Sequence, residues 1–201
     1  PGDERRICGK TVFPNEDAAL IAYTLRNQSN GSVQAGVRLM IDMQVGAGTT
    51  GDYAPFFLPS VGTRTTESEF TSGNMPEYFK AFESPTFAEN SLRAQGLLRG
   101  YGMTTPDRLV LATCLAGRGG GAGIWDSIWD YAITPGATIG DSAVGYWWGP
   151  YSLNAGQSKQ VQTASASAAQ GAATLVIGGI GRDLVSLIGL FVVAIWIDPL
   201  W

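Results

Sequence analysis

Hydrophobic and polar residues alternate along much of the first 162 residues, with the period of two that a β-strand imposes on its side chains. The pattern is plainest in residues 141–161, where Trp147 and Trp148 are adjacent. Adjacent side chains on a strand point to opposite faces of a sheet, so one tryptophan can fill a core while the other meets a different surface. Gly149-Pro150 is expected to end this strand, and Asn154-Ala-Gly156 favours a tight turn before the next strand.

Two alternating runs near the start of the chain are joined by a polar segment. Apolar residues recur at every second position from Ala19 to Leu25 and again from Val33 to Ile41, and the segment between the runs contains Asn30-Gly31. An Asn-Gly pair between two alternating runs is a strong signal for a β-hairpin, which is the local structure predicted here.

Further short strands, separated by loops that contain Gly and Pro, are expected between residue 42 and the stretch 141–161. They fall at residues 56–59, 63–70, 92–99 and 108–114. Residues 75–82 fit either a single helical turn or an aromatic-rich strand. Gly117–Gly123 lacks the Lys-Ser/Thr of a phosphate-binding loop, so a mobile loop is expected. Many short strands with regularly placed turn residues predict a mainly β fold, an antiparallel β-sandwich over residues 1–162.

The composition changes beyond the sandwich. Residues 163–173 are small and of low complexity, which predicts an Ala/Ser linker, and residues 174–201 form an apolar C-terminal segment. The uncharged part, 184–197, is shorter than the roughly 20 residues that a membrane-spanning helix needs, and a longer window includes Arg182 and Asp183. The segment is therefore expected to be either a transmembrane or membrane-docking helix, or a buried terminal strand or core helix.

Burial of apolar side chains from this segment against lipid or a partner protein is the expected mode of association. Two tryptophans suit the aromatic belt at a membrane surface. The candidate contact residues are Leu184, Leu187, Leu190, Phe191, Val193, Trp196 and Trp201.

Charge and the content of His and Cys limit the chemistry that the chain offers. The net charge of −4 and the lack of any basic run argue against nucleic acid as a partner. With no histidine and no CxxC motif, the sequence offers no His general base, no Ser-His-Asp triad and no familiar zinc site, and no metal or other cofactor is expected. Cys8 and Cys114 either form a disulfide, which fits an extracytoplasmic compartment, or are two unrelated buried thiols.

Paired carboxylates are the remaining route to catalysis. Glu67 and Glu69 lie on the same side of an expected strand, and a glycosidase needs two carboxylates roughly 5 to 9 Å apart in a cleft. Alternating Glu residues on a strand are more often a solvated face, so the chain is expected not to be an enzyme. Asp42, Asp52 and Asp141 are oxygen donors near Gly-rich loops, but they lack the spacing of a calcium loop.

Aromatic residues offer a different function. Side chains that are candidates for stacking on sugar rings are Trp125, Trp129, Trp147 and Trp148. Aromatic residues on strands more often fill a core, because they have a large apolar area to bury. A carbohydrate-binding β-sandwich module is therefore the alternative function.

Short motifs along residues 18–162 are similar to those of a known kind of module. They include Gly36-Val-Arg-Leu-Met-Ile-Asp42, Ala54-Pro-Phe-Phe57, Pro106-Asp-Arg-Leu-Val110, Trp129-Asp-Tyr131, Asp141-Ser-Ala-Val144 and Leu153-Asn-Ala-Gly-Gln-Ser-Lys159. In this order they resemble the β-sandwich repeat module of bacterial surface and periplasmic proteins of poorly known function. The resemblance implies the fold and an extracytoplasmic location, in the periplasm or at the cell surface, and it implies no catalytic residue.

The chain departs from that module at both ends. A long β-rich half usually precedes the part that matches Tyr23, and a Tyr-Gly-Leu-Gly-like strand usually follows the position of Thr163. The chain thus resembles half of a larger sandwich, the other half being absent or supplied by a partner through strand addition. Pro1 stands where a start codon would give Met, so a removed leader or a longer parent product is expected.

Together these features predict a non-enzymatic, extracytoplasmic structural or interaction module. Its apolar C-terminal segment is expected to hold it, as an accessory subunit, at a membrane or a membrane protein complex.

Overall fold

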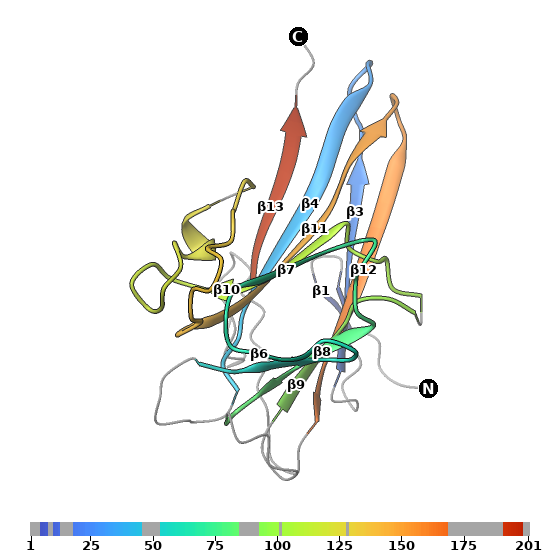
Figure 1. Cartoon of the computed structure of the whole chain (residues 1–201). Coiled ribbons are helices and arrows are strands. Elements are labelled where there is room, and N and C mark those ends of the chain that lie inside the picture. Colours follow the sequence, from blue (N-terminus) through green and yellow to red (C-terminus); the bar gives the residue numbers. More distant parts are fainter. Residues whose placement is uncertain are drawn as a thin grey trace.

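The computed structural model describes the chain over residues 5–7, 10–12, 18–45, 53–84, 93–100, 102–127, 129–168 and 191–198. In this part of the chain, strands form two antiparallel sheets in a β-sandwich-like arrangement (Figure 1). A 3-10 turn, η1 (Ile124–Asp126), is the one helical element among the described residues. The prediction of a mainly β fold built from antiparallel strands is confirmed.

In the described part of the chain, the larger sheet has eight strands in the spatial order β1-β2-β3-β12-β9-β8-β5-β6. They are β1 (Arg5–Ile7), β2 (Lys10–Val12), β3 (Ala18–Arg26), β12 (Ser158–Ala168), β9 (Arg93–Leu97), β8 (Tyr78–Phe82), β5 (Phe56–Leu58) and β6 (Gly62–Arg64). The segment 75–82, which the sequence assigns to either a helical turn or a strand, therefore contributes strand β8.

The smaller sheet, as far as the structure describes it, has five strands in the order β13-β4-β11-β10-β7. They are β13 (Phe191–Asp198), β4 (Val33–Asp42), β11 (Ser142–Leu153), β10 (Arg108–Thr113) and β7 (Ser68–Thr71). Within this sheet β11 is central, because it pairs with β4 on one side and with β10 on the other.

The main hydrophobic core lies between the two sheets. Trp148 and Tyr146 extend into it from β11, with their rings stacked at a centroid distance of 5.6 Å and an interplanar angle of 7°. The indole Nε1 of Trp148 donates a hydrogen bond of 2.8 Å to the carbonyl oxygen of Thr104, so the polar atom of this buried side chain has a partner. Phe56 and Phe79 extend the aromatic cluster from the larger sheet.

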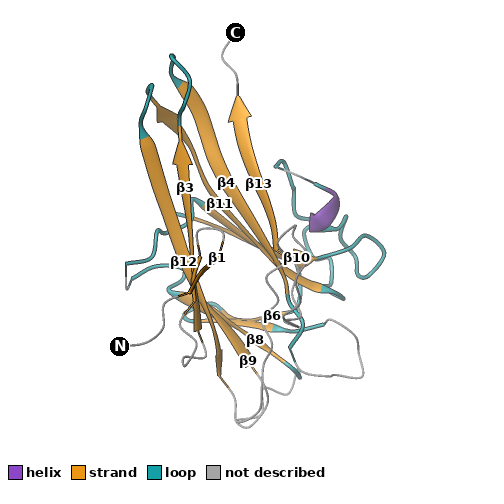
Figure 2. Cartoon of the chain, turned by 180° about the vertical axis from the view of Figure 1, so that it is seen from behind, coloured by secondary structure: helices purple, strands orange, loops and turns teal. Residues whose placement is uncertain are grey.

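A second core lies on the opposite face of the smaller sheet. Residues 115–127 and 129–141, which include η1, lie beside that sheet on the side away from β3 and β12 and are called the covering segment below (Figure 2). Buried side chains there are Met40, Val110, Ala112, Cys114, Ile124, Tyr131, Ala143 and Trp147. Because both faces of the sheet are covered, β10 and β11 have nearly continuous apolar sequences rather than strict alternation. Trp147 and Trp148 lie in different cores, as the alternation predicts.

The predicted β-hairpin between residues 19 and 41 is wrong in its pairing, although both strands exist. β3 belongs to the larger sheet and β4 to the smaller one, so the connection crosses from one sheet to the other. Asn27 organises this connection: its Nδ2 donates to the carbonyl oxygens of Gly31 at 2.6 Å and Leu153 at 2.8 Å, and its Oδ1 accepts from the amide of Ser29. The two apolar faces therefore meet across the core instead of lying side by side in one sheet.

Strand β11 does not end at Gly149-Pro150, contrary to the sequence prediction. It continues to Leu153, and the register with β4 shifts between Trp148 and Tyr151. Gly149 has a φ angle of 89°, a conformation that glycine adopts without steric cost. The Gly-Pro pair thus makes a bulge within a strand, and the following turn passes the chain to β12 in the other sheet.

The C-terminal part is described in two pieces. β12 continues to Ala168, into the segment 163–173 for which a linker is predicted, and there it pairs with β9. Phe191–Asp198 forms β13, which pairs with β4. The other residues of the apolar segment 174–201 lie outside the described residues, and with them most of the predicted membrane helix. Among the residues that are described, no helix has the length and hydropathy to cross a membrane.

Candidate functional site

Three residues form a row across the outer face of the smaller sheet. Trp147 of β11 is the register partner of Arg108 on β10 and of Arg38 on β4. The guanidinium carbons of Arg108 and Arg38 lie 4.7 Å and 5.2 Å from the centroid of the Trp147 ring. Both distances suit a cation–π interaction, so this indole is held between two cations.

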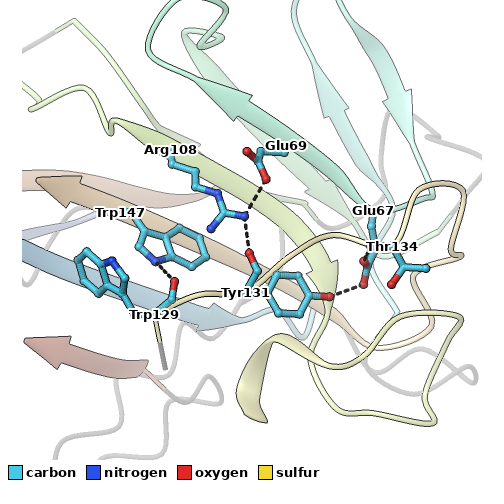
Figure 3. A network of polar contacts seen from close by, with 7 residues as sticks. All are labelled: Glu67, Glu69, Arg108, Trp129, Tyr131, Thr134 and Trp147. Atoms are coloured by element: carbon cyan, nitrogen blue, oxygen red, sulfur yellow. Dashed lines mark hydrogen bonds and ion pairs between the residues drawn. The ribbon is translucent and has the colours of Figure 1, made fainter. Parts of the chain in front are cut away.

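The position of Trp147 depends on the absence of a side chain beneath it. A Cβ atom at Gly145 would lie 2.6 Å from Cη2 of Trp147 and 2.8 Å from Cδ1 of Ile124, closer than real carbon contacts. The indole Nε1 donates a 3.1 Å hydrogen bond to the carbonyl oxygen of Trp129 (Figure 3). Trp147 is buried, with 3% of the residue exposed, and its indole is held by the hydrogen bond and by the contacts with the two arginines.

Arg38 is a buried cation. It is 1% exposed, and one of its terminal nitrogens donates a 2.6 Å hydrogen bond to the carbonyl oxygen of Ile124, while its Nε has no hydrogen-bond partner among the described residues. Burial lowers the pKa of Arg38 to about 10, and the positive charge of Arg108 acts in the same direction. The charge of Arg38 is thus costly in this position, and the residue holds η1 against the sheet.

Arg108 connects the strands to the covering segment, residues 115–127 and 129–141. Its Nη2 donates a hydrogen bond of 2.7 Å to Oε2 of Glu69 on β7 and another to the carbonyl oxygen of Tyr131 (Figure 3). The side chains of Arg108 and Glu69 are 23% and 33% exposed, so this ion pair is only partly screened by water. Glu69, a candidate catalytic carboxylate in the sequence, is therefore the partner of an arginine.

Glu67, the other candidate carboxylate, is buried and accepts hydrogen bonds from three groups. Its Oε1 accepts from the hydroxyl of Tyr131 at 2.7 Å and from the amide of Thr113 at 3.3 Å, and its Oε2 accepts from the amide of Thr134 at 2.7 Å. Burial, and then the hydrogen bond to Glu67, raise the pKa of Tyr131. Glu67 thus fixes the covering segment to the sheet and presents no open carboxylate to a substrate.

Part of the glycine-rich segment 117–123, for which a mobile loop is predicted, lies close to its neighbours, whereas Gly117 has nothing within 4 Å of an added Cβ atom. A Cβ atom at Gly121 would collide with the carboxylate of Glu67, and one at Gly120 would lie 3.1 Å from Cα of Ala137. The glycines thus allow close approach of the segment to the rest of the covering layer.

A pocket of about 380 Å³ lies at the end of this network, beside the bulge in β11. Its lining residues are Asp107, Arg108, Trp129, Asp130, Tyr131, Trp147 and Gly149. The Oδ2 atom of Asp107 accepts a 2.7 Å hydrogen bond from the amide of Gly149, which fixes one carboxylate at the rim. Asp107 and Asp130 are exposed and Trp129 is partly exposed, so the pocket presents acidic, guanidinium and aromatic groups together.

The four candidate stacking tryptophans do not form one exposed platform. Trp148 is in the main core, Trp147 lies between two arginines, and Trp125 and Trp129 are partly buried against the second core. These positions argue against stacking on sugar at Trp147 and Trp148. Trp129 is the one member of the set that both lines the pocket and keeps some exposure.

A group of potential metal ligands lies near the other end of the sheet. Ligand atoms of Asp42, Cys114 and Asp141 lie within 4.8 Å of one another. Each of these side chains also has other interactions, so the group is part of the packing around Cys114. Asp52 and Cys8 lie outside the described residues, and the disulfide between Cys8 and Cys114 stays a prediction.

The predicted contact residues of the C-terminal segment are only partly described. Phe191, Val193 and Trp196 lie in β13, where their register partners are Ile41, Leu39 and Gly36. The remaining members lie outside the described residues: Leu184, Leu187, Leu190 and Trp201.

Sequence reasoning missed the polar members of this network. Arg38, the adjacent pair Asp107 and Arg108, and Tyr131 come from three separate stretches of the chain. The available signal was the pair of arginines on two strands that also carry many apolar residues, since a charged residue in such a strand needs a partner.

No protein-family model, curated protein or solved structure matches this chain.

Proposed function

We propose that the chain is a non-enzymatic interaction module that associates with a membrane protein complex or membrane surface outside the cytoplasm. The observation that carries this proposal is the pairing of β13 with β4, from Phe191 opposite Ile41 to Asp198 opposite Gln34. β13 is the terminal strand of the smaller sheet as described, and its sequence is apolar at every position except the last. A terminal strand of this composition suits the addition of a further strand from a partner, or burial against lipid.

The contacts of the polar side chains support a binding role rather than catalysis. Glu67 and Glu69, the two carboxylates that a hydrolase would need, hold Tyr131 and Arg108 in place. The resemblance of residues 18–162 to modules of surface and periplasmic proteins supports the extracytoplasmic location.

The decisive experiment is membrane fractionation with an alkaline wash, applied to the full chain and to three variants. The variants are a chain that ends at Gln170, Val193→Asp in β13, and Leu115→Asp as the matched control, because Leu115 is an exposed apolar residue far from β13 in sequence. The full chain and Leu115→Asp should stay in the membrane pellet. The shortened chain and Val193→Asp should move to the supernatant.

Two results would contradict the proposal. If the full chain is itself in the supernatant, β13 completes the sheet and holds nothing to a membrane. If Val193→Asp and the shortened chain both stay in the pellet, another part of the chain carries the association.

A further inference from the structure

We propose that the pocket beside the bulge of β11 binds a neutral saccharide unit. Its volume of about 380 Å³ lies within the range of pockets that hold small molecules. This binding site is separate from β13, on which the association with a membrane complex depends, so either property can exist without the other.

The polar groups at the pocket suit a ligand with many hydroxyl groups. Asp107 and Asp130 place two exposed carboxylates at the rim, which disfavour an anion and can accept hydrogen bonds from hydroxyls. The charge of Arg108, in the same lining, is already paired with Glu69, so Arg108 contributes N–H donors rather than an unpaired positive charge. Each hydroxyl of a saccharide can donate to a carboxylate and accept from a guanidinium.

The aromatic part of the lining suits the apolar face of a sugar ring. Trp129 is partly exposed, whereas Trp147 and Tyr131 are each 3% exposed. A Cβ atom at Gly36 would lie 2.6 Å from Cη2 of Trp129, so the indole rests directly on the backbone of β4. Trp129 is therefore the residue whose ring can contact the C–H groups of a bound saccharide.

The groups around the pocket are already held in place. Arg108 is fixed by Glu69 and by the carbonyl oxygen of Tyr131, and the carboxylate of Asp107 by the amide of Gly149. Trp129 accepts the hydrogen bond from Nε1 of Trp147 through its own carbonyl oxygen. A site with these fixed groups loses little conformational freedom when a ligand binds.

The test is saturation-transfer NMR and calorimetry on the full chain with maltose, cellobiose, lactose and N,N′-diacetylchitobiose as separate probes. At least one of them should bind saturably at millimolar or lower concentration. Asp130→Asn should weaken that binding about tenfold, because it removes the charge from a hydrogen-bond acceptor at the rim without disturbing a buried group. Trp129→Ala should abolish binding.

Two matched variants control for general effects on this layer. Trp125→Ala removes a partly buried indole and Asp126→Asn an exposed carboxylate, and neither residue lines the pocket. Both should bind the same saccharide as the unchanged chain does. If none of the four probes binds, the proposal is overturned. It is also overturned if a probe binds but Asp130→Asn and Trp129→Ala leave that binding unchanged. Saturable binding of choline or inorganic phosphate at this pocket, in place of a sugar, would overturn it as well.

Discussion

Tyr131 donates its hydroxyl hydrogen to Oε1 of Glu67 across 2.7 Å, and this bond joins the covering segment to the strand region before β7. The same tyrosine accepts a hydrogen bond from Arg108 through its carbonyl oxygen, so one residue connects the buried carboxylate with the wall of the pocket (Figure 3). The position of the pocket therefore depends on the buried carboxylate of Glu67.

Replacement of Glu67 by Ala should lower the free energy of unfolding by about 3 kcal/mol or more. The change leaves the hydroxyl of Tyr131 and the amide of Thr113 without their acceptor, and each unsatisfied buried donor costs roughly 1–3 kcal/mol. The amide of Thr134 also loses its acceptor, but this bond is only partly buried and water can replace it. Urea denaturation measures the effect. Glu77→Ala is the control: its carboxylate is 68% exposed and 4.0 Å from Arg99, so a change within about 0.5 kcal/mol is expected. Equal stabilities of the two variants would contradict this role for Glu67.

High pH should destabilise the fold through its buried tyrosines. Burial raises the pKa of Tyr23 and of Tyr151 from 10.0 to about 12, with Asp107 adding to the effect at Tyr151, and it raises the pKa of Tyr146 still further. A folded-state pKa above the unfolded value means that the folded protein keeps a proton which the unfolded chain loses. The stabilisation is complete below pH 10 and declines as the pH rises from about 10 to 12.

The free energy of unfolding measured at several pH values from 8 to about 12 tests the effect of the tyrosines. Tyr23→Phe should show a smaller decline than the unchanged chain, because one of the raised groups is gone. If tyrosinate absorbance rises fully near pH 10 while the protein stays folded, the tyrosines are not buried in the manner described.

Arg38 should be replaceable by an apolar residue of similar size but not by a small one. Arg38→Met loses the hydrogen bond to Ile124, but it also removes a buried charge next to Arg108, so a change within about 1 kcal/mol is expected. Arg38→Ala also leaves a void beside Trp147 and should cost about 3 kcal/mol. Chemical denaturation of both variants gives the comparison. A loss for Arg38→Met as large as that for Arg38→Ala would mean that the guanidinium itself, and not the volume it fills, stabilises the fold.

Periodicity predicts the strands well, but it does not predict which strands pair. The runs that become β3 and β4 each show the expected alternation, and Asn30-Gly31 correctly marks a turn between them. Pairing depends on where the apolar faces meet, and here Ile21 and Leu25 face the core from one sheet while Val37 and Leu39 face it from the other. A turn signal is local, whereas the choice between hairpin and crossover depends on the whole core.

The network on the outer face depends on contacts between distant segments. Alternation places Trp147 and Trp148 on opposite faces, and this part is predictable. That Arg38 and Arg108 both lie opposite Trp147 follows only from the register of three strands, which come from separate parts of the chain. Glu67 was predicted from its alternation to be solvated, and it is buried because Tyr131 and Thr134 cover it with matching donors. These contacts of Glu67 with Tyr131 and Thr134 cannot be predicted from a single sequence.

Substitution of Gly36 by Ala should destabilise the protein by about 1–3 kcal/mol, because the site has no room for a methyl group. The added Cβ would lie 2.6 Å from Cη2 of Trp129 and 2.9 Å from the carbonyl oxygen of Trp148, and the latter is backbone that cannot rotate away. Gly31→Ala is the matched control, since nothing lies within 4 Å of its added Cβ, and its stability should not fall below that of the unchanged chain. Thermal or urea denaturation distinguishes the two variants. If Gly36→Ala is as stable as Gly31→Ala, Trp129 does not rest on β4, and the ring that the saccharide site requires lies elsewhere.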